Sequence, residues 1–214
     1  MERVTDIALA KQIFKTDFIG PEELENISNL LGIKKSSSYD EIPLIPYSLK
    51  KISELVGNYV LILGIPNFID GSPLNLIKMR DFLGINSYKK EPCFYNQDWY
   101  LNESFAKQNN IEFSWYLIRK NIFNETRGIL PGGYKNNLKM PSALLCAYVF
   151  FSYYFHTKGQ ILWSNEYVWC SDFDHNNDQV YVGRYLDSSG INKNGFSIHR
   201  HLKIKKFYGS IDIL

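Results

Sequence analysis

The sequence predicts an α+β fold, and three observations support that prediction. Apolar residues recur at helical spacing through the first third of the chain. From Glu166 onward apolar and polar residues alternate, as they do in strands. Aromatic residues are also unusually frequent, with 15 Tyr, 14 Phe and 4 Trp among 214 residues. Because aromatic rings suit pleated faces and recognition surfaces, this composition does not favour a simple helical bundle.

Length and composition set the class of protein. A chain of 214 residues is enough for one large domain or two small ones with a substantial core. With 45% hydrophobic and 21% charged residues, the composition is globular rather than disordered. The net charge of +2 gives no reason to expect bulk binding of nucleic acid.

The N-terminal third is predicted to be helical. A first helix is expected within 5–15. A second begins at Pro21, where proline and the two following glutamates suit a first turn, and ends at Gly32. A polar connector over 34–40 separates it from a short helix predicted over 46–56.

The middle of the chain alternates between element types. Residues 59–65 form a short β-branched apolar run, which predicts a buried strand. A helix is expected over 74–83, and another over 103–108 with Asn102 as its cap. Residues 111–120, which contain two aromatic residues, are predicted to form a strand.

The longest stretch without a charged residue covers 140–157. It falls short of the roughly 20 apolar residues that a membrane-spanning helix needs, and it contains proline, serine and tyrosine. We therefore predict a buried helix over 141–156. Strands are predicted over 166–174 and 179–185, joined by a polar turn.

A soft boundary near residue 90 divides the predicted elements. Residues 1–90 form a mainly helical portion with one buried strand, and residues 91–214 form a part rich in aromatic residues and strands.

The cysteines and the N-terminus indicate the compartment. The first residues contain neither an apolar signal region nor a cleavage site of small residues. Cys93, Cys146 and Cys170 are odd in number and far apart, and no two have the spacing of a redox or zinc motif. These observations predict reduced thiols in a cytoplasmic protein that does not associate with membranes.

Three segments, at 140–143, 167–172 and 180–183, together resemble the fold group that joins C-type lectins to formylglycine-generating enzymes (sulfatase-modifying factors). Residues 167–172, Tyr-Val-Trp-Cys-Ser-Asp, resemble the group's "VWEWTSD" strand. Residues 140–143 resemble the start of its "LPTEAEW" helix, and residues 180–183 resemble its "RVLRGG" strand. The segments follow one another in the group's order. The resemblance implies a C-type-lectin-like domain preceded by the helical N-terminal portion.

A closer resemblance covers more of the chain. The segments that resemble a family of bacterial hypothetical proteins are 18–24, 94–106, 115–120, 167–174 and 179–192. In many members the sequence varies strongly after the "VYVG" strand. That organisation is similar to the target proteins of diversity-generating retroelements, which display variable residues on a C-type-lectin-like scaffold. The resemblance implies a binding module, although this chain departs from the family pattern in its ending, 196–214.

The C-terminal tail carries the clearest binding signal in the residues themselves. Residues 191–214 contain five Lys or Arg and one Asp. In a strand over 196–204 the histidines share one face, whereas Arg200 falls on the otherwise apolar face, which suggests a bend there. An ordinary amphipathic strand with a solvated basic face is the alternative. The predicted ligand contacts are Asn192, Asn194, Ser197, His199, Arg200, His201 and Lys203.

A second motif, around residue 174, has two interpretations. Residues with side-chain oxygens occur at alternate positions, namely Asp172, Asp174, Asn176 and Asp178. This spacing lets a short loop bind calcium. However, the glycine and glutamate that an EF-hand would need are replaced by Asn177 and Gly183. The other interpretation is a β-hairpin whose turn, 175–178, uses residues that tolerate left-handed backbone. The sequence therefore predicts no cofactor, with calcium at these four residues as the alternative.

The sequence thus predicts a non-enzymatic recognition protein whose partner is a protein or a small ligand. Formylglycine-generating enzymes use a pair of reactive cysteines in their C-terminal segment, and no cysteine follows Cys170 here. No nucleotide-binding or metalloprotease motif is present. The alternatives are an enzyme related to the formylglycine-generating oxidases and a structural or accessory protein of a mobile element or phage.

Overall fold

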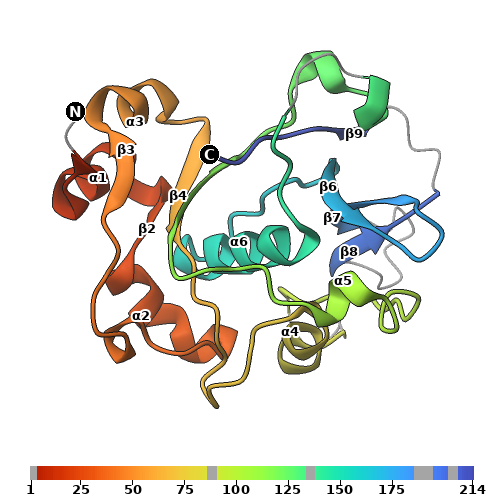
Figure 1. Ribbon diagram of the computed structural model, residues 1–214, viewed down its shortest axis with the longest axis horizontal. Coiled ribbons are helices and arrows are strands. Elements are labelled where there is room, and N and C mark those ends of the chain that lie inside the picture. The colour runs from red at the N-terminus through yellow and green to blue at the C-terminus, as the bar shows by residue number, and fades with distance from the viewer. Residues whose placement is uncertain (1–3, 86–90, 134–137, 186–194, 202–206) are drawn as a thin grey trace.

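The computed structural model describes residues 4–85, 91–133, 138–185, 195–201 and 207–214 (Figure 1). The helices of this part are α1 (Ile7–Phe14), α2 (Pro21–Leu31), α3 (Leu49–Leu55), α4 (Leu76–Leu83), α5 (Ser104–Lys107) and α6 (Ala143–His156). Short 3-10 helices are η1 (Lys15–Asp17), η2 (Ser36–Ser38), η3 (Asn124–Thr126) and η4 (Pro131–Gly133). The strands are β1 (Val4–Thr5), β2 (Phe18–Ile19), β3 (Ile45–Ser48), β4 (Tyr59–Leu63), β5 (Trp115–Arg119), β6 (Tyr167–Phe173), β7 (Gln179–Tyr185), β8 (Gly195–His199) and β9 (Tyr208–Gly209). The predicted α+β class is confirmed.

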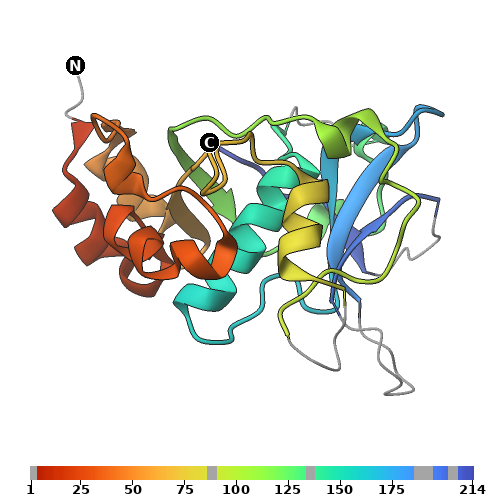
Figure 2. The same cartoon turned by 90° about the horizontal axis from the view of Figure 1, so that it is seen from below.

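Helix α6 lies at the centre of the core. Every residue from Ala143 to Tyr153 is buried, which explains why this segment of the sequence carries no charge. In both ribbon views α6 lies between the N-terminal elements and the strands β6, β7 and β8 (Figures 1 and 2). Its first turn is capped twice, because the Ser142 hydroxyl accepts the N–H of Leu145 at 3.1 Å and the Asp172 carboxylate accepts the N–H of Ala143 at 2.6 Å. The prediction of a buried helix here is confirmed.

The central strand of a three-stranded sheet is β4, with β2 parallel to it on one side and β5 antiparallel on the other. The antiparallel register pairs Tyr59 with Arg119 and Leu63 with Trp115. All five residues of β4 are buried, as expected for a strand covered on both faces. Because β4 precedes residue 90 and β5 follows it, this sheet crosses the predicted boundary. One hydrophobic core also extends from Ala10 to Ile213, so that boundary does not coincide with a break in the core.

The second large sheet has the strand order β8-β7-β6-β9. Strands β6 and β7 form an antiparallel hairpin, β8 pairs antiparallel with β7, and β9 runs parallel to β6. Alternate residues of the first three strands belong to the main core, namely Val168, Cys170, Val180, Val182, Phe196 and Ile198. Intervening residues form a separate aromatic cluster with β9, made of Tyr167, Trp169, Tyr181 and Tyr208. The sheet is therefore apolar on both faces.

All of the predicted helices except α2 start one to three residues later in the structure, and the cause is clear for two of them. The helix predicted over 46–56 begins only at Leu49, because 45–48 form β3 and pair with β1. The Ser48 hydroxyl then accepts the N–H of Lys51 and caps the helix. The helix is therefore shorter at its start than the periodicity of the sequence predicted. Likewise, α5 starts at Ser104, with Glu103 rather than Asn102 at the N-cap position. The carboxylate of Glu103 is used elsewhere, as described below.

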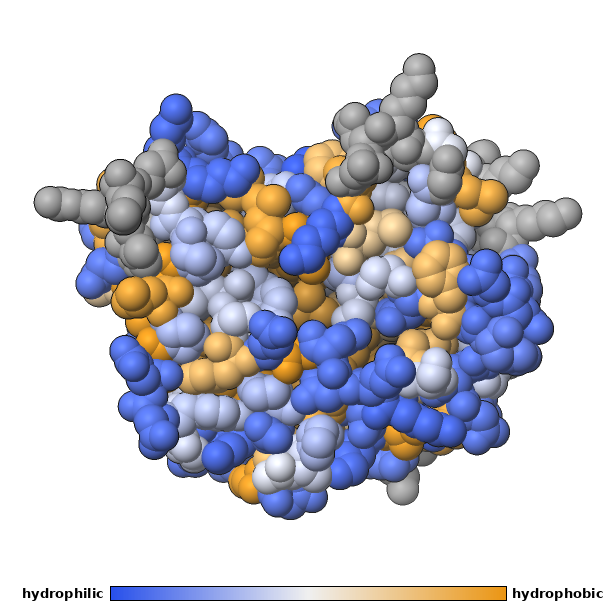
Figure 3. All heavy atoms as spheres, viewed as in Figure 1, coloured by the Kyte–Doolittle hydropathy of each residue, from blue (hydrophilic) through white to orange (hydrophobic). Residues whose placement is uncertain are grey.

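The molecular surface is mostly hydrophilic on the face drawn in Figure 3, with hydrophobic residues scattered in small patches. Among the described helices, none combines the length and the apolar character that crossing a bilayer requires.

Candidate functional site

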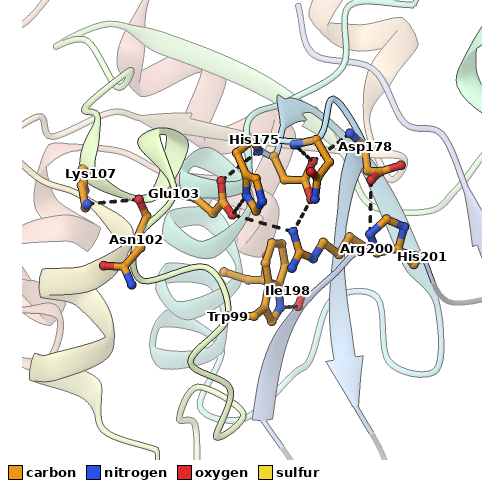
Figure 4. Close-up of polar contacts among 11 residues, drawn as sticks. Trp99, Asn102, Glu103, Lys107, His175, Asp178, Ile198, Arg200 and His201 are labelled. Carbon is orange, nitrogen blue, oxygen red and sulfur yellow. Dashed lines mark hydrogen bonds and ion pairs between the residues drawn. The ribbon is translucent and has the colours of Figure 1, made fainter.

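A polar cluster forms where the β6–β7 turn meets the end of β8 and the start of α5 (Figure 4). We call it the Arg200 cluster, and its members are Trp99, Glu103, Asp174, His175, Asp178, Arg200 and His201. The three segments that supply these residues are far apart in the sequence.

Arg200 holds the cluster together. Its Nη1 forms an ion pair with Asp174 Oδ2 and lies 3.8 Å from Glu103 Oε1. The guanidinium carbon lies 4.5 Å from the centroid of the Trp99 ring, within the range of a cation–π interaction. The Trp99 ring is fixed in turn, because its Nε1 donates to the backbone oxygen of Ile198 at 2.9 Å. Arg200 is thus held by a carboxylate and an aromatic ring at once.

The side chain of Asp174 is fully buried. Its Oδ1 accepts the backbone N–H groups of Asn176 and Asp178, both at 2.9 Å, while Oδ2 accepts from Arg200. Burial alone would raise the pKa of Asp174, but the hydrogen bonds from the Asp178 N–H and from Arg200 outweigh burial and hold that pKa below its ordinary value. Asp174 therefore stabilises the turn as a charged carboxylate. Asn177, within that turn, has a φ of 65°, and the predicted hairpin is confirmed.

Glu103 connects α5 to the same turn. Its Oε2 accepts the backbone N–H of His175 at 3.0 Å, and its Oε1 lies 2.6 Å from His175 Nδ1. The side chain of Glu103 is 6% exposed, whereas that of His175 is 64% exposed. The buried carboxylate thus orients an imidazole that projects into solvent.

A second imidazole lies at the other end of the turn. His201 Nε2 lies 3.2 Å from Asp178 Oδ2, and the two side chains are 54% and 40% exposed. The backbone of His201 has a φ of 62°, a left-handed conformation that non-glycine residues adopt infrequently. His175, Asp178 and His201 are consequently the exposed members of a cluster whose other members are buried or half-buried.

The structure brings together only some of the predicted binding residues. Arg200 and His201 belong to the cluster, at the bend that follows β8. Ser197 is fully buried and its hydroxyl donates to the Gly183 oxygen at 3.0 Å, so it does not lie on a binding surface as predicted. His199, which is 6% exposed, is likewise inside the protein. Asn192, Asn194 and Lys203 lie outside the described residues.

The environment of His199 explains why it is buried as a neutral ring. Its ring centroid lies 5.4 Å from that of Tyr167 and 5.7 Å from that of Tyr181. Gln97 accepts the Ile198 N–H through Oε1, which leaves its amide nitrogen facing His199 Nδ1 at 3.2 Å. The amide nitrogen can only donate, so Nδ1 accepts and the ring proton is on Nε2. Burial lowers the pKa of His199 to about 4.

The four residues predicted to bind calcium do not point to one centre. The Asp172 carboxylate caps α6, and burial raises its pKa. Both carboxylate oxygens of Asp174 already accept hydrogen bonds, from two backbone N–H groups of the turn and from Arg200. The side chain of Asn176 is exposed. The arrangement therefore does not support a site made of Asp172, Asp174, Asn176 and Asp178.

Within the described part of the chain, two other groups have potential metal ligands within 4.8 Å of one another, namely Glu103 with Asp174 and His175, and Asp174 with Asp178 and His201. Both groups depend on Asp174. A cation bound by Asp174 would have to displace the guanidinium of Arg200, which already neutralises this buried carboxylate. Arg200 thus supplies the positive charge that a metal ion would otherwise supply beside Asp174.

Sequence reasoning did not identify Trp99, Glu103 and His175 as site residues. Glu103 and His175 are 72 positions apart, and no local pattern in the sequence connects them. The one available signal was the bend expected at Arg200, since a charged residue on an apolar strand face must find a partner or leave the strand.

Comparison with protein-family models, with curated proteins and with solved structures found no match for this chain.

Proposed function

We propose that the protein is a non-enzymatic recognition protein that binds a protein or small ligand on the Arg200 cluster. One observation carries this proposal: exposed His175, Asp178 and His201 side chains stand on a buried framework of ion pairs and hydrogen bonds. A framework that fixes contact side chains before binding reduces the ordering entropy lost on association. Two imidazoles flanking a carboxylate offer donors and acceptors to a polar ligand.

The C-type-lectin-like arrangement of residues 91–214 is part of this proposal. Each of the three segments that resemble that fold group lies in the element type expected for it. Residues 167–172 lie in β6, residues 180–183 lie in β7, and residues 140–143 lead into α6. This agreement supports a scaffold that displays binding residues, as in the retroelement target proteins, but at the β6–β7 turn as well as after β8.

The state of the cysteines favours binding over thiol catalysis. Cys93, Cys146 and Cys170 are all buried. Burial, together with the nearby Glu91 carboxylate, raises the pKa of Cys93 to about 11, and burial raises that of Cys170 well above its ordinary value. Because the thiolate is the nucleophile, these two groups are inert at neutral pH.

Thiol labelling tests this conclusion. We expect the native protein at pH 7.5 to react with none of its three thiols during minutes of exposure to a maleimide, and to react with all three in 6 M guanidinium (about the concentration that unfolds most domains). Mass spectrometry counts the adducts. Rapid modification of one thiol in the native protein would instead favour the enzyme related to the formylglycine-generating oxidases.

A matched pair of triple variants tests the binding surface. Peptides selected from a random displayed library against the wild-type protein should lose about tenfold or more in affinity for a variant with His175→Ala, Asp178→Ala and His201→Ala. Because these side chains are exposed, the melting temperature should change by about 2 °C or less. A variant with Lys50→Ala, Lys51→Ala and Glu54→Ala on α3, a helix that lies far from α5, β7 and β8 in Figure 1, should bind as the wild type does.

Three results would count against the proposed surface. These are failure to select any peptide, unchanged binding by the cluster variant, and equal losses in both variants. His199 and Arg200, which were also predicted to contact the ligand, are unsuitable for this test, because both side chains are substantially buried and their replacement would change stability.

A further inference from the structure

A cleft of about 640 Å³ lies away from the Arg200 cluster and shares no residue with it. Its walls come from five segments that are distant in sequence. These are the segment after β5, the residues after η3, the end of α6, the connection from α6 to β6 and the residue before β9. We call it the Trp163 pocket. The residues that line it include Lys120, Arg127, Tyr153, Trp163, Glu166 and Phe207. Its volume is within the range of about 300–1,000 Å³ that small-molecule sites occupy.

Two cations are fixed in the pocket wall. Lys120 Nζ lies 2.6 Å from Asp17 Oδ2, and Arg127 Nη2 lies 2.7 Å from Glu166 Oε1. The Tyr153 hydroxyl donates to the other oxygen of Asp17 at 2.9 Å, which holds that carboxylate behind the wall. Asp17 is buried and is not part of the lining, so the lining contains two cations and one carboxylate. Each cation is thus paired with one carboxylate. An ammonium has three N–H donors and a guanidinium five, so each cation can donate to a ligand as well as to its carboxylate.

Aromatic residues line the same pocket as the two cations. Phe207 is 47% exposed at the pocket, although a ring of this size is usually buried. Trp163 also lines the pocket but is 3% exposed, and its indole N–H has no acceptor in the described part of the chain. Because Phe207 and Arg127 line the same pocket, a flat ligand within it has both a stacking surface and a charge partner.

The backbone of this wall is held in an uncommon conformation. Trp163 has a φ of 51° and Asn165 a φ of 63°, and a left-handed tryptophan is a conformational outlier. The conformation is kept by the Trp163 oxygen, which accepts the N–H of Glu166 at 3.2 Å and that of Arg184 at 3.4 Å. These bonds tie the loop to β7 and place Glu166 against Arg127. Residues held in strained conformations are concentrated at ligand sites.

We propose that the Trp163 pocket binds a small anion that carries a flat unsaturated ring, with a phosphate or carboxylate group as its charge. The anion pairs with Arg127 and Lys120, and the ring stacks on Phe207. The pocket's volume suits a mononucleotide-sized molecule rather than a polymer. This site is separate from the recognition surface of the Arg200 cluster, and neither depends on the other.

Isothermal titration calorimetry of the full chain tests the proposal with four probes. Adenosine 5′-monophosphate and indole-3-acetate each combine a ring with an anion, whereas adenosine and inorganic phosphate supply one part each. At least one ring-bearing anion should bind about tenfold or more tightly than either single-part probe. The identity of the tighter one distinguishes phosphate from carboxylate. Absence of millimolar binding by both ring-bearing anions, or equal binding by neutral adenosine, would overturn the proposal.

Variants assign the binding to this pocket. Arg127→Ala and Phe207→Ala should each weaken the better probe by about fivefold or more, in line with a charge-assisted hydrogen bond and a ring stack. Phe207 is exposed, so its variant should remain folded even if the loss of Arg127 perturbs Glu166. The control His201→Ala, in the Arg200 cluster, should bind the probe as the wild type does. Unchanged affinity in the Phe207→Ala variant, or an equal loss in the control, would refute this pocket as the binding site whatever the outcome for the recognition surface.

Discussion

Replacing Arg200 by methionine should lower the free energy of unfolding by about 3 kcal/mol at pH 7. Methionine retains much of the apolar contact with Trp99, but it leaves the fully buried Asp174 carboxylate without its positive partner. Two backbone N–H groups would remain as donors to Asp174, which is too little to replace the charge. Urea unfolding followed by tryptophan fluorescence measures the change.

A double variant separates the buried charge from the lost contacts. Asp174→Asn removes the charge but keeps an oxygen that accepts the two backbone N–H groups of the turn. The Asp174→Asn, Arg200→Met double variant should therefore be more stable than Arg200→Met alone by about 1 kcal/mol or more. If the effects of the two substitutions simply added, the pair would not be coupled in this way.

Lowering the pH from 7 to 4 should reduce the free energy of unfolding by about 3 kcal/mol through His199 alone. The pKa of His199 is about 4 in the folded protein and about 6.5 when unfolded. Below pH 6.5 the unfolded chain therefore binds a proton that the folded protein excludes. The stabilisation is fully present above pH 6.5, and it is lost progressively as the pH falls toward 4. Protonation at Nδ1 would also turn a donor toward the amide of Gln97, which is itself a donor there.

Urea unfolding at several pH values between 7 and 4 tests the role of His199. The variant His199→Gln should show a much shallower decline, because it has no group to titrate at that position. His156 is the matched control, since burial lowers its pKa as well, and His156→Gln should remove only a smaller part of the slope. Equal pH dependence in the wild type and in His199→Gln would contradict the assignment. The charge of Asp174 is lost only at still lower pH, because its folded pKa is depressed.

Patterns within one element were sufficient to predict much of the secondary structure. The uncharged stretch containing α6 predicted burial because a helix without charges has no face for water, and the hairpin of β6 and β7 followed from alternation on both sides of an Asn-rich turn. The start of α3 was predicted less well, because pairing with β1 outweighed the local helical pattern from 46 to 48. The boundary near residue 90 was predicted from a local change in composition, whereas the pairing of β4 with β5 joins segments on either side of it.

The candidate site was predicted only where one segment supplied it. Arg200 and His201 stood out as basic residues within an amphipathic strand predicted over 196–204, and the structure places both in the cluster. Ser197 and His199 share the alternating face of that strand, but alternation does not tell whether a polar face meets water or other side chains. Here the face meets Tyr167, Tyr181 and Gln97, which come from distant parts of the chain.

By itself, the sequence determined the α+β class, the buried central helix, the hairpin and the polar character of its turn. Each of these depends on interactions over a few residues, such as side-chain periodicity, capping and turn conformation. Tertiary structure alone decided which side chains form the two sites. Glu103 meets His175 across 72 positions, and Lys120 meets Asp17 across 103. Such contacts arise because packing around α6 brings distant segments together, and the resulting loss of water then requires each buried charge to have a partner.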